Sequence, residues 1–326
     1  DKPMSWICKV RPRLPQFMIH YQLDLLRNVF AQHEAISSLE DFKDDDESIK
    51  MLEDMLKDDK VYFGVRGHVA RALAVFNSEL TDDKHMRVLL DWYSSQFFAS
   101  SANSQKLIVK PHDFHDVPRH FVQLEVIKSL SIIRNSQNYT PERIVTTLIA
   151  ILEQANNNTN NMYSDDYFNA EVILAFGRFR NENENFYKET SRKILNKLSL
   201  HASIPSYCNI ITSAGYEALT AISLKTEIFT PDIKEMRSVV LEPTNYFECR
   251  ASVFRDLLFL CIYLKGITFA ELVSDIKTLI LQGESEMASM CLRQIYRFIL
   301  NTVHVGDQDH FQTYLLALPE GMSRDD

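Results

Sequence analysis

Glu125-Val126-Ile127-Lys128-Ser129-Leu130 is one copy of a six-residue phrase that recurs seven times along the chain. In every copy the second residue is small or β-branched, and the third and sixth residues are apolar. These three positions share one helical face, because residues three or four apart are neighbours on the surface of an α-helix. The copies of this repeat phrase are Glu34–Leu39, His68–Leu73, Glu125–Leu130, Glu171–Phe176, Glu217–Ile222, Ser252–Leu257 and Met290–Ile295.

The spacing of the repeat phrase predicts the fold. The sixth residues of successive copies are 34 to 57 residues apart. This spacing suits a two-helix repeat of the HEAT or armadillo kind, with loop insertions in the longer units. We therefore expect an all-α protein, a right-handed α-solenoid of about seven HEAT/armadillo-like helix pairs. The phrase should lie on the second helix of each pair, and the solenoid should offer a long binding surface rather than a catalytic pocket.

Polar and proline-containing segments suggest how the chain is organised. Residues 1–27 contain several prolines and are interpreted as a lead-in, or junction, from a missing upstream domain. Residues 28–326 are expected to form the solenoid. Two polar stretches, near residues 100–118 and 156–163, predict loop insertions, since they have little apolar surface to bury.

Two tripeptides predict helix starts. Thr140-Pro141-Glu142 and Thr230-Pro231-Asp232 each supply a threonine as N-cap, a proline at the first helical position and an acid in the first turn. Both precede a copy of the repeat phrase, which favours the assignment of that phrase to the second helix of a pair.

The composition argues against several function classes. Only 8 of the 326 residues are glycine, too few to favour a phosphate-cradling loop. The five cysteines form no C-x-x-C pair, so neither a zinc finger nor a disulfide framework is indicated. A formal charge of −9 argues against a surface dominated by nucleic-acid binding. No stretch is long and apolar enough for a membrane span, and we expect a soluble, intracellular protein.

Two groups of residues resemble metal or catalytic sites, and neither is convincing. His33-Glu34-Ala35-Ile36-Ser37 is one ligand short of the metalloprotease pattern H-E-x-x-H, because Ser37 stands at the second zinc-ligand position. The second group has no helical i, i+4 pair except Asp116 with His120 and contains no cysteine, so it is better explained as a polar loop before a capped helix. Its members are His112, Asp113, His115, Asp116 and His120. We expect no enzyme activity, no cofactor, no metal and no small-molecule substrate.

The fourth residue of the repeat phrase points away from the apolar face and is basic in four copies. If the phrase helices line a concave surface, these residues form a broken basic ladder that could hold an acidic partner segment. The alternative is an ordinary solvated helix face, since lysine and arginine are good exposed helix formers. The candidate partner-binding residues are Arg71, Lys128, Arg255 and Arg293.

Several segments resemble, in order, the HEAT-like region of the TFIID subunit 2 family. The resemblance is strong to about Leu200 and weaker beyond it. It rests on Tyr21-Gln22-Leu23, Arg27-Asn28-Val29, Ala31–Ile36, Tyr62-Phe63-Gly64-Val65-Arg66, Asp113-Phe114, Phe121-Val122-Gln123 and Tyr163–Phe168.

This resemblance implies a nuclear, non-catalytic scaffold within TFIID, which takes part in preinitiation-complex assembly for RNA polymerase II. The implied partners are the C-terminal tail of TFIID subunit 8, TFIID subunit 1 and other TFIID subunits. In that family an aminopeptidase-like domain precedes this region, and promoter DNA would be contacted mainly through that missing part. The alternatives are the C-terminal domain of an active zinc aminopeptidase, a generic HEAT-repeat adaptor and a DNA-binding module.

Overall fold

The computed structural model describes residues 22–23, 28–77, 83–99, 107–154, 161–226, 230–264 and 267–305. Most of the predicted lead-in therefore lies outside the described residues, as do residues 100–106 of the first predicted insertion and 156–160 of the second. The chain divides into two compact units, Asp1–Glu182 and Asn183–Asp326, and each is described by itself.

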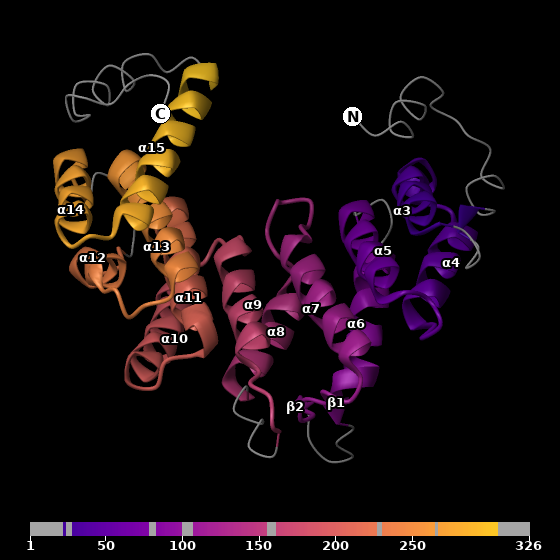
Figure 1. The fold of residues 1–326 in the computed structure, drawn as a ribbon. Coiled ribbons are helices and arrows are strands. Elements are labelled where there is room, and N and C mark those ends of the chain that lie inside the picture. Colours follow the sequence, from indigo (N-terminus) through magenta and orange to yellow (C-terminus); the bar gives the residue numbers. More distant parts are fainter. Residues whose placement is uncertain are drawn as a thin grey trace. The chain divides into compact units, whose positions relative to one another are not determined.

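The N-terminal unit is built from helices, with one short sheet in its described part (Figure 1). The sheet pairs β1 (Phe98–Ala99) with β2 (Ile108–Val109) in antiparallel register. The helices are α3 (Val29–Ser38), the 3₁₀ turn η1 (Leu39–Phe42), α4 (Asp46–Lys57), α5 (Phe63–Phe76), α6 (Lys84–Phe97), α7 (Val117–Ile132), α8 (Glu142–Gln154) and α9 (Asp166–Arg178).

The described part of the C-terminal unit is entirely helical. Its α13 continues into a short π-helical segment, η4. The elements are α10 (Glu184–Ser203), the 3₁₀ turn η3 (Tyr207–Asn209), α11 (Ile210–Thr226), α12 (Ile233–Leu241), α13 (Phe247–Phe259), η4 (Leu260–Leu264), α14 (Phe269–Leu281) and α15 (Ser285–Val305).

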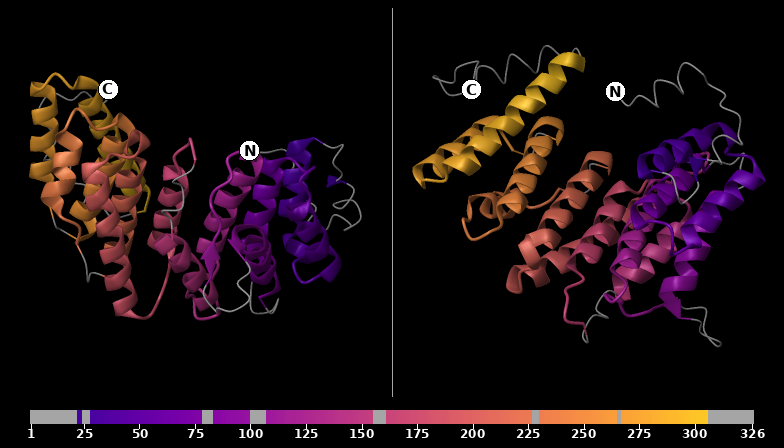
Figure 2. Two further views of the ribbon diagram at one scale, coloured as in Figure 1. Left: turned by 90° about the horizontal axis from the view of Figure 1, so that it is seen from below. Right: turned by 45° about the vertical axis from the view of Figure 1, so that its right-hand side comes forward.

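The repeat phrases lie on alternate helices, which we call the phrase helices: α3, α5, α7 and α9 in the first unit and α11, α13 and α15 in the second. Within each unit the phrase helices pack against one another in chain order. The helices between them form a second layer, and α8, α10, α12 and α14 each pack against the phrase helix that follows (Figures 1 and 2). The prediction of an all-α helix-pair repeat is therefore confirmed.

The core contains the phrase positions that the sequence assigns to it. The second, third and sixth residues of the seven phrases are at most 6% exposed, except Leu292 in the last phrase, which is half-buried. Because such apolar burial is the main favourable term in folding, the repeat phrase is a packing code for the stack.

The two helix starts lie close to their predicted places, but the threonines do not cap them. Helix α8 begins at Glu142, while the hydroxyl of Thr140 accepts a hydrogen bond from the Arg180 backbone N–H at 3.1 Å. Helix α12 begins at Ile233 and is capped by Asp232, which accepts from the N–H groups of Lys234 and Glu235. A carboxylate nearer to the free N–H groups replaces the hydroxyl in the second case.

In the part of the chain that the structure describes, no helix is long and apolar enough to cross a membrane. Four cysteines are described and are free thiols. Cys249, Cys261 and Cys291 are buried, and Cys208 is half-buried. Burial raises the pKa of the Cys249 and Cys291 thiols to about 12 and that of the Cys261 thiol to about 11, so these three buried residues behave as apolar side chains.

Candidate interaction surface

Each phrase helix has a stripe of side chains on a face other than its core face. The stripe consists of four residues: the first and fourth residues of the phrase, the residue four positions before the first, and the residue four positions after the fourth. This 4-3-4 spacing places them in line on one helical face. On α7 the stripe is Phe121, Glu125, Lys128 and Ile132, all exposed or half-buried. We call this line the outer stripe.

The outer stripes of the N-terminal unit begin with exposed aromatic rings. Phe30, Phe121 and Tyr167 occupy the first stripe position on α3, α7 and α9. On α5 that position is Gly64, and the Tyr62 ring takes its place, because a Cβ at Gly64 would lie 2.6 Å from Tyr62 Cε1. The four rings, which we call the aromatic row, are Phe30 (78% exposed), Tyr62 (52%), Phe121 (46%) and Tyr167 (52%).

Ring contacts connect the aromatic row to its neighbours. Tyr62 packs against Phe63 with ring centroids 4.5 Å apart, and Phe63 stacks on Phe121 of α7 at 5.4 Å. His120, next to Phe121, contacts Phe114, which in turn contacts Tyr163 just before α9. Aromatic pairs at such separations are attractive, so the starts of α5, α7 and α9 present a joined aromatic surface.

Two of the four candidate basic residues are paired with glutamates of the same stripes. Lys128 Nζ lies 2.7 Å from Glu125 Oε1 and 4.0 Å from Glu171 Oε2 on α9. Arg255 Nη2 lies 2.7 Å from Glu217 Oε2 on α11. The charge of Lys128 is therefore offset mainly by the first residue of its own phrase, and that of Arg255 by the first residue of the preceding phrase. The spacing within a single phrase reveals only the first of these pairs.

The other two candidates keep their charge uncompensated. Arg71 on α5 and Arg293 on α15 are exposed, and neither forms an ion pair among the described residues. Arg71 and Lys128 belong to the N-terminal unit, and Arg255 and Arg293 belong to the C-terminal unit. The basic ladder therefore remains a proposal, with Arg71 and Arg293 as its available charges.

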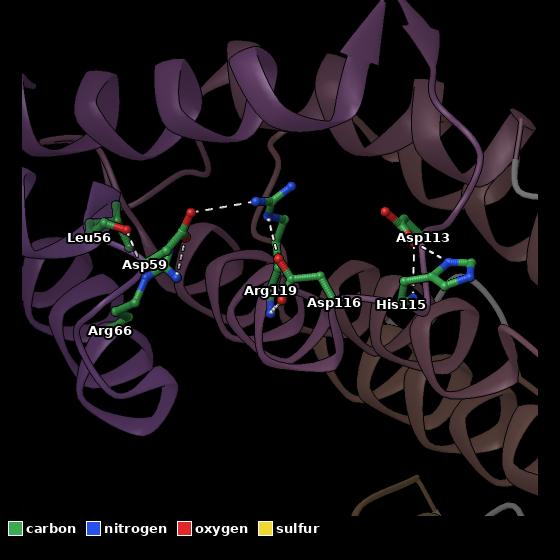
Figure 3. A network of polar contacts seen from close by, with 7 residues as sticks. All are labelled: Leu56, Asp59, Arg66, Asp113, His115, Asp116 and Arg119. Carbon is green, nitrogen blue, oxygen red and sulfur yellow. Dashed lines mark hydrogen bonds and ion pairs between the residues drawn. The ribbon is translucent and has the colours of Figure 1, made fainter.

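A buried arginine, which lies outside the six-residue repeat phrase, joins three elements of the N-terminal unit (Figure 3). Arg66 is 3% exposed, and its Nε donates to the Leu56 carbonyl at the end of α4 at 3.0 Å. Its Nη1 donates to Asp59 Oδ1 at 2.8 Å, and Asp59 Oδ2 lies 3.5 Å from Nη2 of Arg119. Arg119 also pairs with Asp116, the N-cap of α7.

The C-terminal unit contains an equivalent arginine. Arg250, also 3% exposed, donates from Nε to the Val240 carbonyl at the end of α12 at 2.8 Å. Its Nη1 lies 3.2 Å from Glu284, directly before α15. Both arginines lie ten residues after the carbonyl that they bond, and both follow the pattern Tyr-Phe-x-x-Arg at Tyr62–Arg66 and Tyr246–Arg250. That pattern was the available sequence signal.

The histidine-rich segment before α7 packs as part of the protein. Burial lowers the pKa of His112 to about 4, and the His112 ring packs on Phe168 at 4.3 Å. Burial also lowers the pKa of His120. His115 instead pairs with Asp113 on the surface, so the five residues do not converge. Among the described residues no group of three or more His, Cys, Asp or Glu side chains could hold a metal ion.

The H-E-x-x-H-like segment is likewise part of the helix packing. His33 on α3 stacks on His68 of α5 with ring centroids 4.6 Å apart. Ser37 Oγ lies 3.1 Å from His68 Nε2. Both contacts join neighbouring phrase helices, which accounts for these polar residues without a zinc ion.

Stacked helix pairs with buried phrase positions and a varied, mostly exposed stripe define an α-helical repeat protein. Comparison with known families gives a more specific assignment. The family described as TAF2-like, TPR repeats matches residues 16–310, and the chain belongs to this family. TPR repeats, like HEAT repeats, are built from helix pairs, so the family description agrees with the architecture.

Similar proteins are transcription factor subunits. The chain is 28% identical over 236 residues to transcription initiation factor TFIID subunit 2 of Schizosaccharomyces pombe, covering 67% of this chain and 20% of that protein. It is 28% identical over 233 residues to the Danio rerio protein of the same name, covering 67% and 19%. The Saccharomyces cerevisiae protein is 26% identical over 181 residues, covering 53% and 12%. The matched part of the chain thus spans about a fifth of the first two relatives.

Proposed function

We propose that this chain is a non-catalytic scaffold region of a TFIID subunit. Its helical-repeat surface holds segments of other TFIID subunits and thereby supports core-promoter recognition during preinitiation-complex assembly by RNA polymerase II. The observation that carries the proposal is the family match over residues 16–310. The three relatives above share the name TFIID subunit 2, which favours this proposal over a zinc-aminopeptidase domain.

The surface suits such a role. The outer stripes combine exposed rings, as in Phe121 and Tyr167, with exposed charges such as Arg71 and Arg293. Repeat proteins present these side chains on an extended surface, where many separate contacts add up to useful affinity. The proposed partners are the C-terminal tail of TFIID subunit 8 and TFIID subunit 1, and the proposed location is the nucleus.

A pull-down tests this function directly. The full chain is immobilised, its helical fold is checked by circular dichroism, and it is offered the C-terminal tail of TFIID subunit 8 from the same organism. A tail of equal length and shuffled sequence serves as the control. We expect retention of the native tail only. Failure of a folded chain to retain either tail would refute the proposed partner.

The basic ladder is a second contact that we propose within the same function, for an acidic partner segment. Arg293→Glu should weaken capture of that segment more than Arg255→Glu, because the charge of Arg255 is already offset by Glu217. Titration with an acidic peptide measures both variants. Equal affinities for both variants and the unchanged chain would remove the ladder.

A further inference from the structure

The aromatic row of the N-terminal unit has a spacing and a chemistry that point to a particular kind of partner. We propose that it binds a proline-rich segment in the polyproline II conformation, with lysine or arginine beside its prolines. The inference rests on the proposed scaffold function in one respect: the segment belongs to another chain. It adds the site and the chemical class of that segment.

The spacing of the rings matches the repeat of a polyproline II helix. The row has one ring at the start of each of four phrase helices that pack in succession, and packed helices have axes 8–10 Å apart. A polyproline II helix has three residues per turn and rises about 3.1 Å per residue, so equivalent residues repeat about every 9 Å. A segment that crosses the helices can therefore place every third residue on the next ring.

The rings also have the chemistry of a surface that binds proline. Tyr62 and Tyr167 offer a flat apolar face and a phenol group, and Phe121 offers a face supported by Phe63. Aromatic grooves of this composition bind proline-rich segments, which are already extended and lose little conformational entropy on binding. Tyrosine also donates hydrogen bonds to the carbonyl groups that a polyproline II helix leaves solvated.

The charge beside the aromatic row favours a basic segment. The loops and first turns at the starts of α5, α7 and α9, beside the aromatic row, carry more acids than bases. The acids are Asp58, Asp59, Asp113, Asp116, Asp165 and Asp166, and the bases are Lys60, Arg66, Lys110 and Arg119. Asp59 and Asp116 are paired with Arg66 and Arg119, so the excess of negative charge comes from the remaining acids, of which Asp113 is 65% exposed. A segment with lysine or arginine beside its prolines complements this excess of negative charge.

Other occupants are less consistent with these observations. An acidic segment would meet the excess of carboxylates around the row. A second copy of this chain would bring its own acidic helix starts against them, and like charges in an interface are unfavourable. The experiment below detects either occupant: preferred binding of the acidic peptide would indicate an acidic segment, and self-association of the chain would indicate a second copy.

The test uses the full chain and three labelled twelve-residue peptides in fluorescence anisotropy titrations. The probe is (Pro-Pro-Arg)₄. The peptide (Gly-Ser-Arg)₄ keeps the charge without the polyproline II conformation, and (Pro-Pro-Glu)₄ keeps the conformation with the opposite charge. We expect the probe to bind with a dissociation constant of about 0.1 mM or tighter, and each control peptide about tenfold more weakly. Equal binding of all three peptides, or no binding of the probe below about 1 mM, would overturn the proposal.

Variants then locate the contact. The double variant Phe121→Ser, Tyr167→Ser should weaken binding of the probe by at least about tenfold, because few aromatic residues carry most of such an interface. Tyr296→Ser is the matched control, since Tyr296 is an equally exposed ring (56%) on α15. It should leave the affinity unchanged. Equal losses in both variants, or no loss in either, would refute the assignment to the aromatic row. Sedimentation of the free chain detects self-association through the row.

The same double variant separates this inference from the proposed function. If the unchanged chain and the double variant retain the tail of TFIID subunit 8 equally, the scaffold function stands and the aromatic row is not its docking site. If the unchanged chain binds the probe but not the tail, the row binds proline-rich segments and the proposed partner is wrong.

Discussion

The two units share their packing code and differ on their outer stripes. The second, third and sixth phrase residues are buried in both units, with Leu292 as the half-buried exception. The first stripe position carries or lies beneath an aromatic ring throughout the N-terminal unit. In the C-terminal unit that position is Ser213, Glu248 or Glu286, and the one exposed ring beside it among the described residues is Tyr246, the counterpart of Tyr62. Since exposed rings contribute little to their own core, the difference suggests that the N-terminal row contacts a partner. We attribute the similarity of the buried phrase positions to the requirements of core packing, and the differences at the first stripe position to binding.

The largest expected effect concerns the shared packing code. Ile127→Ala, at a fully buried phrase position, should destabilise the N-terminal unit by about 3–4 kcal/mol. Leu292→Ala, at the half-buried equivalent position, should cost only about 1 kcal/mol. Urea unfolding of both variants measures the difference. Equal losses of unfolding free energy would show that the burial of a phrase position does not determine how much it contributes to stability.

The two buried arginines should give the next largest effect. Arg66→Met and Arg250→Met each leave a helix-end carbonyl without its donor, and we expect a loss of about 2–3 kcal/mol for Arg66. The loss for Arg250 should be smaller, because its Nη2 has no hydrogen-bond partner among the described residues and is costly to bury. Thermal and urea unfolding rank the two variants. A larger loss for Arg250→Met would contradict this account of the pair.

The units should also respond oppositely to pH. In the N-terminal unit burial lowers the pKa of His85 and His112 to about 4, from an ordinary value of 6.5. The unfolded chain therefore binds more protons between these values, and stability falls as the pH drops below about 6.5, by up to about 2 kcal/mol per histidine at pH 5. Hydrogen exchange of α6 and α7 at pH 7 and pH 5 measures this loss. Equal protection at both values would contradict the prediction.

In the C-terminal unit the dependence has the other sign. Burial raises the pKa of Asp256 to about 8, although the Arg255 guanidinium opposes this effect. The folded state then binds a proton that the unfolded state releases near pH 4, so stability falls as the pH rises from about 4 to about 8. Asp256→Asn should remove this dependence and make the C-terminal unit more stable than the unchanged chain at pH 8. Hydrogen exchange of α13 checks both statements, and an unchanged pH profile in the variant would refute them.

The smallest expected effect concerns the ion pairs of the outer stripes. Arg255→Gln breaks an exposed pair with Glu217 and should cost less than about 1 kcal/mol. Arg293→Gln, which breaks no ion pair, should cost nothing measurable. Differential scanning calorimetry at low and high salt compares the two variants. A loss from Arg255→Gln that does not shrink in high salt would show that the pair acts through packing instead of charge.

The sequence predicted the fold because burial repeats with helical spacing. Val126, Ile127 and Leu130 are buried as their phrase positions indicate. The residues that cap the helices could not all be predicted from the sequence. Thr140 accepts a hydrogen bond from Arg180, forty residues away, and no local sequence pattern indicates that partner. The same reason applies to Arg255, whose charge is offset by Glu217 on the neighbouring helix α11.

The candidate site was only partly predictable. Arg66 and Arg250 lie two residues before their repeat phrases, so a comparison limited to six residues omits them, although Tyr-Phe-x-x-Arg is present twice. The aromatic row is harder to predict, because Tyr62 joins it by folding over Gly64, a placement that only the side-chain geometry reveals.

Photo-crosslinking from equivalent positions of the two units tests the central claim most directly. A crosslinking amino acid is placed at Phe121 in one preparation and at Glu248 in another, since both are first stripe positions. Each is mixed with the C-terminal tail of TFIID subunit 8. The account predicts a crosslink to the tail from position 121 and none from position 248. A crosslink from position 248 alone, or binding of the tail with a crosslink from neither position, would contradict it.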